Sequence, residues 1–331
     1  MCTVMILALL ALLQGSPSWS SALALQPRVV IVPGFLYGAK NYEGMCKNLR
    51  HAGVDAMIAP IAAWHWLPVL GGRSVRPILE RIDFAVDAAA DASVSAMPWP
   101  QYSIADLLAD FKDTPGGVLR AGGTSDPEQF PNVEPRGGFF KDGQKLVRPF
   151  ASQKTKEVPK VALIAHSAAG WISRIYLSSE EYAGASYRGC DKVSALVTLG
   201  SPFTAASGVA FANVGKAKRM TVDAFLPILA VAGKGAVGAE AGDFTRNSYA
   251  FCGVDAPTLG ECDGDGVTPL SAALDLDGAE QLILDGITTH APEYPPLVAP
   301  ELAQSRREGV PWYGDEERLR HWLPWLLQRS S

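Results

Sequence analysis

The sequence predicts an α/β fold, in which a mostly parallel central sheet is flanked by helices on both faces. Short runs of β-branched and aliphatic residues alternate with longer stretches whose apolar residues recur at helical spacing. Periodicity is lost among glycine pairs and prolines over residues 93–158, which indicates an irregular insertion or cap. The chain of 331 residues, 48% of them hydrophobic, is long enough for one such domain, which we place at 25–331.

Six stretches are expected to be strands, and four segments outside 93–158 are expected to be helices; within 93–158 only 104–111 has a helical pattern. The strands are 28–32, 55–61, 161–164, 193–199, 227–232 and 281–284. The helices are 41–52, 77–92, the segment that follows residue 170, and 315–328. Ligands of parallel sheets bind at the carboxyl ends of the strands, so we look for functional residues there.

Charge and the N-terminus restrict where the protein works and what it contacts. The net charge is −5 without a long basic run, which argues against a nucleic acid partner. Residues 4–13 form an apolar run too short to span a bilayer, and Ala22-Leu23-Ala24 has the form of a cleavage site. We therefore expect residues 1–24 to be a signal peptide that leads into the secretory pathway. An uncleaved anchor and a plastid address are the alternatives.

Four cysteines remain after this segment: Cys46, Cys190, Cys252 and Cys262. In an oxidising compartment, Cys252 and Cys262 are the favoured disulfide pair because they bracket one loop that contains glycine and proline. Buried free thiols are the alternative. The chain has no C-x-x-C or His/Cys cluster, so no zinc or other metal site is predicted.

The central stretch of the chain is 160–179. An apolar run is followed by very small residues around Ser167 and then by a helical pattern. This order is that of a nucleophile elbow, G-x-S-x-G, except that Ala165 and Ala169 take the glycine positions and Gly170 follows one residue later. The other interpretation is a serine that caps a helix.

A second turn of interest follows the first strand, at Pro33-Gly34-Phe35-Leu36. Gly34 would allow the backbone to approach a substrate, and the N–H of Phe35 or Leu36 would then point inward as an oxyanion donor. An ordinary strand-to-helix turn is the alternative.

A serine nucleophile needs a base, and the base needs an orienting carboxylate. His290 follows the last strand and is the favoured base. His166 adjoins the serine, so we expect its side chain to project elsewhere and to be structural, and His65 lies early in the chain. The two remaining histidines fall in predicted helices, at His51 and His321.

Asp265 is the favoured acid because it lies between glycines in a loop before Val-Thr-Pro, with Asp263 and Asp285 as competitors. A calcium loop is a weaker interpretation of this acidic segment. It would place Ala272 where a bidentate glutamate belongs.

Several of these motifs together resemble the lipase-like α/β-hydrolases of plants and cyanobacteria, a family similar in turn to the catalytic domain of the GPI inositol-deacylases. The motifs are VVIVPGF, IAHSAAGW, VTLGSPF, GDGVTPLSAAL, ILDGITTHAP and GVPWYG; they cover about 29–325 without the insertion. The resemblance implies an α/β-hydrolase fold with Ser167 as nucleophile, Asp265 as acid and His290 as base. It also implies that Phe35 and Ala168 donate to the oxyanion, with Gly34 supporting them.

The expected activity is a cofactor-free hydrolysis of carboxylic esters, either small molecules or acyl lipids, through an acyl-enzyme. Residues 203–225 are a candidate lid, and peripheral contact with a membrane is compatible with a lipid substrate. Two alternatives stay open: transfer of the acyl group to an alcohol, and a non-catalytic protein that binds a lipid or a partner on the same fold.

Overall fold

The computed structural model describes residues 26–91, 159–208, 211–238, 242–293 and 310–329. The expected signal peptide (1–24) and the expected insertion (93–158) lie outside the described residues. Within the part of the chain that is described, no helix is both long and apolar enough to cross a membrane.

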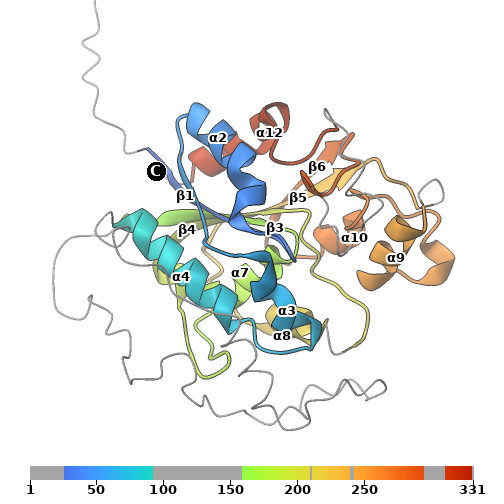
Figure 1. Cartoon of the computed structure of the whole chain (residues 1–331), viewed down its shortest axis with the longest axis horizontal. Helices are drawn as coiled ribbons and strands as arrows, with labels where there is room; N and C mark the ends of the chain where they lie inside the picture. Colours follow the sequence, from blue (N-terminus) through green and yellow to red (C-terminus); the bar gives the residue numbers. More distant parts are fainter. Residues whose placement is uncertain (1–25, 92–158, 209–210, 239–241, 294–309, 330–331) are drawn as a thin grey trace, which may run out of the picture.

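The described residues form an α/β structure built on one six-stranded sheet in which every neighbouring pair of strands is parallel (Figure 1). The strand order is β2-β1-β3-β4-β5-β6. The strands are β1 (Arg28–Val32), β2 (Asp55–Ile58), β3 (Val161–His166), β4 (Val193–Leu199), β5 (Ile228–Lys234) and β6 (Glu280–Asp285). All six predicted strands are therefore confirmed, with small differences at their ends.

The differences at the strand ends have local causes. β2 stops before Pro60, which has no N–H to donate to the ladder. β3 runs two residues past the predicted end, because His166 still pairs with Leu199 of β4. That extension places the end of β3 directly at Ser167.

Two layers of helices cover the sheet (Figure 1). α2 (Glu43–His51) and α12 (Glu316–Leu327) cover one face, and α4 (Arg76–Ala90) and α7 (Ala169–Leu177) cover the other. Alternate residues of the strands face opposite layers: Val30 belongs to the cluster on the α4 side, and its neighbour Val29 to the cluster on the α2 side. Burying each such side chain stabilises the fold by roughly 1.5–3 kcal/mol.

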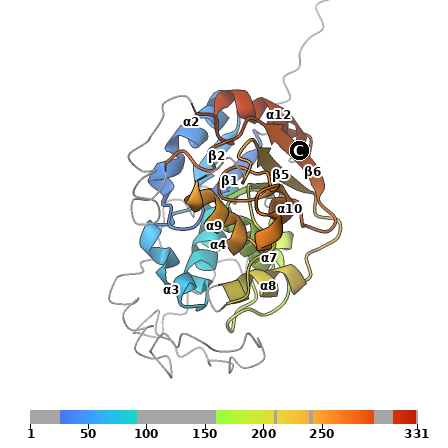
Figure 2. The ribbon, with the colours of Figure 1, turned by 90° about the vertical axis from the view of Figure 1, so that its right-hand side faces the viewer.

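The strand order has a switch point between β1 and β3, because the chain leaves β1 toward β2 and leaves β3 toward β4 on the opposite side. Crevices at such points, beyond the carboxyl ends of the strands, are where α/β sheets bind ligands. Gly34 follows β1 and Ser167 follows β3, so both lie at this point. In Figure 2, α9 (Asp243–Phe251) and α10 (Leu270–Ala273) lie in front of the sheet, among the segments that join β5 to β6.

The candidate lid, 203–225, contains the helix α8 (Ala212–Arg219), which packs against α7. Val214 and Ala217 are buried there, and the Arg174 guanidinium of α7 donates to the carbonyls of Ala217 (3.3 Å) and Met220 (3.2 Å). Movement of this segment as a lid would have to break these contacts.

The four cysteines of the described residues are free thiols, so the favoured Cys252–Cys262 disulfide is not formed. The two thiols point to different backbone carbonyls, that of Cys252 toward Val267 (3.7 Å) and that of Cys262 toward Asp263 (4.0 Å). Cys252 is buried at the end of α9, and burial raises the pKa of its thiol. The alternative of buried free thiols therefore describes Cys252 and Cys46 better.

Candidate active site

Ser167 occupies a strained turn between β3 and α7. Its φ of 56° lies in the left-handed region, which costs a residue other than glycine roughly 1–2 kcal/mol. The turn is fixed from both sides: the Ser167 N–H donates to the Leu199 carbonyl (2.9 Å), and the Gly170 N–H donates to the Ser167 carbonyl (3.0 Å). Ala165 and Ala169 are fully buried in this turn, so the two alanines fit where the motif has glycine.

The turn after β1 lies against the Ser167 turn. A Cβ atom placed on Gly34 would lie 2.8 Å from the Ser167 Cβ and 2.9 Å from Nδ1 of His166, so only glycine fits there. The Tyr37 N–H donates to the Gly34 carbonyl (3.0 Å), and the turn that this bond closes contains Leu36 with a φ of 60°. Two strained non-glycine residues thus meet at the switch point, as is common at functional sites.

Two backbone donors flank the serine. Within the described residues, no group accepts a hydrogen bond from the N–H of Phe35 or of Ala168. Both residues are partly exposed. Both N–H groups could therefore donate to a further acceptor.

Asp265 and His290 form a buried pair. The Asp265 Oδ2 and the His290 Nδ1 are 2.7 Å apart, and the two residues are 0% and 2% exposed. A carboxylate oxygen accepts, so His290 donates from Nδ1, and Nε2 is the nitrogen that faces away from the acid. Of the three candidate acids, Asp265 is therefore the one that pairs with His290. Asp263 instead accepts from the N–H groups of Gly235 and Gly264 (both 2.8 Å), and Asp285 is exposed at the end of β6.

Further donors hold the Asp265 carboxylate. Its Oδ1 accepts from the N–H groups of Val267 (3.0 Å) and Thr268 (2.7 Å), and its Oδ2 accepts from the Tyr313 hydroxyl (2.7 Å). Burial by itself raises the pKa of this carboxyl. The His290 ring and the donors named above outweigh burial, so the pKa of Asp265 is lowered and the group stays ionised.

His166 is closer to the site than the sequence predicted. Its ring centroid lies 4.6 Å from that of His290, and its two nitrogens bond to Tyr42 Oη (2.6 Å) and to the His290 carbonyl (2.8 Å). The prediction that it is structural and does not act as the base agrees with these bonds, since both nitrogens are engaged. Nothing in the sequence pointed to Tyr42, and Tyr313 was present only as a letter of the GVPWYG motif.

The other histidines do not reach the site as bases. His65 accepts a hydrogen bond from the Ala62 N–H at Nδ1 (2.8 Å), and burial together with Arg81 lowers its pKa to about 3. His51 and His321 lie on the predicted helices α2 and α12, and both are exposed.

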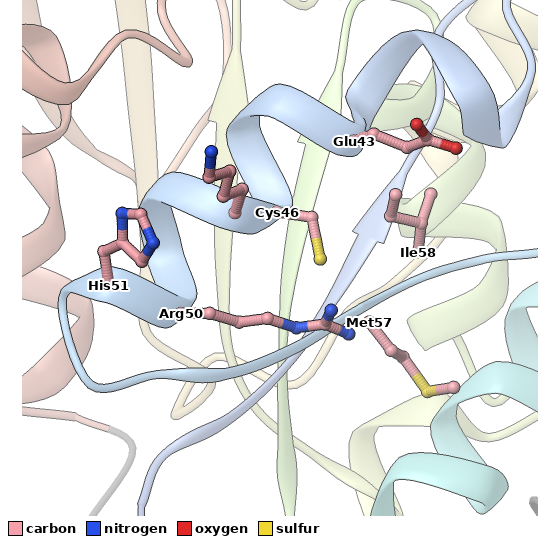
Figure 3. A pocket seen from close by; sticks show the side chains of 7 residues that line it. Glu43, Cys46, Arg50, His51, Met57 and Ile58 are labelled. Atoms are coloured by element: carbon pink, nitrogen blue, oxygen red, sulfur yellow. The ribbon is translucent and has the colours of Figure 1, made fainter.

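A surface hollow of about 460 Å³ lies elsewhere, between α2 and the edge strand β2 (Figure 3). Its lining residues are Glu43, Cys46, Lys47, Arg50, His51, Met57 and Ile58. None of the predicted site residues lines it, so we place the candidate site by the convergence of strand ends and not by this hollow.

Comparisons with known proteins add no family: no protein-family model matches this chain, and no curated protein matches it. The family resemblance of the sequence motifs therefore stays a prediction, and the functional argument depends on the geometry described above.

Proposed function

We propose that this protein is a serine ester hydrolase of the α/β-hydrolase class, with Ser167 as nucleophile, His290 as base and Asp265 as acid. The observation that carries the proposal is the buried Asp265–His290 pair (2.7 Å), whose residues follow the carboxyl ends of β5 and β6 as the strained Ser167 turn follows that of β3. The chain order Ser, Asp, His is also that of this class.

The chemistry follows from these groups without a cofactor. The Ser167 oxygen bonds to the ester carbonyl carbon as its proton moves to His290 Nε2, and the carbonyl oxygen becomes an oxyanion. The N–H groups of Phe35 and Ala168 would hold that oxyanion, and one such donor is worth roughly 3 kcal/mol of transition-state stabilisation. When the carbonyl re-forms, the C–O bond to the alcohol breaks, and the alcohol leaves with the proton from His290.

The acyl-enzyme is then resolved by water. His290 takes one proton from the water while the water oxygen bonds to the acyl carbon. His290 then gives that proton to the Ser167 oxygen as the carboxylic acid product leaves. Throughout both steps Asp265 remains ionised, orients the imidazole and stabilises the imidazolium. The lowered pKa of Asp265 supports this role.

Apolar surroundings of the Phe35 turn favour an acyl group as substrate. The Phe35 ring contacts the Trp66 ring edge-on, with centroids 5.7 Å apart, and Leu36 belongs to the same buried cluster. Leu70, four residues after Trp66, is 49% exposed. We therefore propose carboxylic esters with an apolar acyl chain.

Labelling with a fluorophosphonate probe tests the proposal. The wild-type protein should be labelled, Ser167→Ala should not, and the control Ser179→Ala should behave as wild type because Ser179 is an exposed serine after α7. All three should have the same circular dichroism. A folded wild-type protein that takes no label, or a labelled Ser167→Ala, would contradict the proposal. Chain-length profiling with p-nitrophenyl esters then tests the acyl preference.

A further inference from the structure

Four residues on four different segments are connected by a single buried hydrogen-bond chain behind Ser167. The Gly34 N–H contacts the Tyr42 oxygen (2.9 Å), the Tyr42 oxygen contacts His166 Nδ1 (2.6 Å), and His166 Nε2 contacts the His290 carbonyl (2.8 Å). Tyr42 and His166 are 0% exposed.

The direction of every bond in this chain is determined. A backbone carbonyl can only accept, so His166 carries its proton on Nε2 and donates to His290. A neutral imidazole then accepts at Nδ1, so the Tyr42 hydroxyl donates to it. The Tyr42 oxygen in turn accepts from Gly34. Burial and the neighbouring His290 lower the pKa of His166 to about 3, which agrees with a neutral ring.

The two ends of the hydrogen-bond chain lie at two parts of the proposed site, the oxyanion turn and the base. Gly34 precedes the Phe35 N–H, and His290 is the base. The segments of Tyr42 and His290 also meet at the surface, where Asn41 Nδ2 donates to Glu293 (3.1 Å). His166, the residue before the nucleophile, is therefore the connection between the oxyanion turn and the base loop.

We infer that His166 and Tyr42 are positioning residues. Their hydrogen bonds, each with one determined donor and acceptor, hold the Phe35 N–H and His290 in place relative to Ser167. A neutral His166 suits this place because His290 takes up a proton during the reaction. A second imidazolium with its centroid 4.6 Å away would oppose that protonation. The inference rests on the proposed function for its catalytic consequence, and on the hydrogen bonds alone for its structural one.

The first test compares second-order rates of fluorophosphonate labelling. Tyr42→Phe and His166→Phe should each label about 10-fold to 100-fold more slowly, because each breaks the chain while keeping a ring in place. The double variant should be little slower than either single variant, since both remove the same connection. His166→Gln should recover part of the rate, because an amide can donate to a carbonyl and accept from a hydroxyl.

Tyr182→Phe is the matched control. Tyr182 lies in the loop after α7 and is also buried; its hydroxyl accepts from the Val75 N–H (3.0 Å) and donates to Asn213 (2.8 Å). It should lose comparable thermal stability and keep the wild-type labelling rate. Rates within twofold of wild type for Tyr42→Phe and His166→Phe would overturn the inference, and so would a loss in Tyr182→Phe of the same size.

A second measurement separates this inference from the proposed function. Amide hydrogen exchange at Gly34 should be faster in both Tyr42→Phe and His166→Phe than in wild type and in Tyr182→Phe. Unchanged protection of Gly34 in His166→Phe would overturn the inference even if the wild type is labelled. Conversely, the wild-type protein could take no label while Gly34 exchange still responds to both variants. That result would contradict the proposed hydrolase function and support the hydrogen-bond connection.

Discussion

Two buried tyrosines serve the two halves of the candidate site in the same way and with different partners. Tyr42 accepts from the N–H of Gly34 and donates to His166. Tyr313 accepts from the N–H of Gly233 (2.7 Å) and donates to the Asp265 carboxylate (2.7 Å). Each hydroxyl therefore connects a glycine at or near the end of a strand to a side chain of the site.

The difference between the two tyrosines is the charge of the acceptor. Tyr313 donates to an ionised carboxylate, and such bonds are about twice as strong as those between neutral groups. Tyr42 donates to a neutral imidazole whose pKa is about 3. A buried tyrosine hydroxyl therefore stabilises the negative charge of Asp265 in one half of the site. In the other half, the same kind of bond only fixes the position of the neutral His166 ring.

The largest expected effect is at the charged half. Asp265→Asn removes the carboxylate that orients His290 and stabilises its protonated form, so kcat should fall by about 10,000-fold with a smaller change in KM. The matched control Asp285→Asn alters an exposed carboxylate and should stay within twofold of wild type. Equal activity of Asp265→Asn and the control would mean that the carboxylate is not the acid.

The next effect compares Gly34 and Gly233, the two glycines that donate to the buried tyrosines. In Gly34→Ala the new Cβ would lie 2.8 Å from the Ser167 Cβ, so labelling of Ser167 should fall about 100-fold, since small misplacements cost that much. In Gly233→Ala the new Cβ would lie 2.6 Å from Cγ2 of the buried Ile287 and 2.7 Å from the Tyr313 hydroxyl, so this variant should lose more thermal stability than Tyr313→Phe and at least as much labelling. Labelling rates of both variants, with melting curves, measure this difference.

Tyr313→Phe should have a moderate effect. It removes one of the donors to Asp265 and leaves the His290 bond and both backbone donors in place, so we expect about a 10-fold loss of kcat. The pKa of the Asp265 carboxyl should rise, because a hydrogen bond to its charged form is lost. Steady-state kinetics across acid pH, beside Tyr182→Phe as control, should show activity lost at a higher pH in Tyr313→Phe alone.

The last effect concerns stability and not activity, and it is the pH dependence of stability that His166 contributes. Its pKa is about 3 in the folded protein, against 6.5 as its ordinary value, so the unfolded chain binds more protons between these values. Stability should therefore fall as the pH is lowered from 6.5 toward 3, by up to about 1.4 kcal/mol per pH unit from this residue. Denaturant titrations should show a shallower fall in His166→Phe, whereas the exposed His321→Asn should keep the wild-type slope.

Much of the fold could be predicted from the sequence because its signals are local. Each strand is a contiguous run of apolar residues, so all six were found, and Gly34 and Ser167 were placed after β1 and β3. The choice of Asp265 depended on glycines beside it, and this is the carboxylate that pairs with His290, whereas Asp263 and Asp285 do not. The same local reasoning failed for the Cys252–Cys262 disulfide, since closeness in sequence does not determine where two thiols point.

What the sequence determined by itself was the six strands and the helices α2, α4, α7 and α12, and therefore the loops that carry Ser167, Asp265 and His290. Only the tertiary structure decided which distant groups meet: Tyr42 with His166 across 124 residues, and Tyr313 with Asp265 across 48. The physical reason is that a buried hydroxyl bonds to whichever polar group the fold places within about 3 Å, and no pattern in the sequence indicates which group that is.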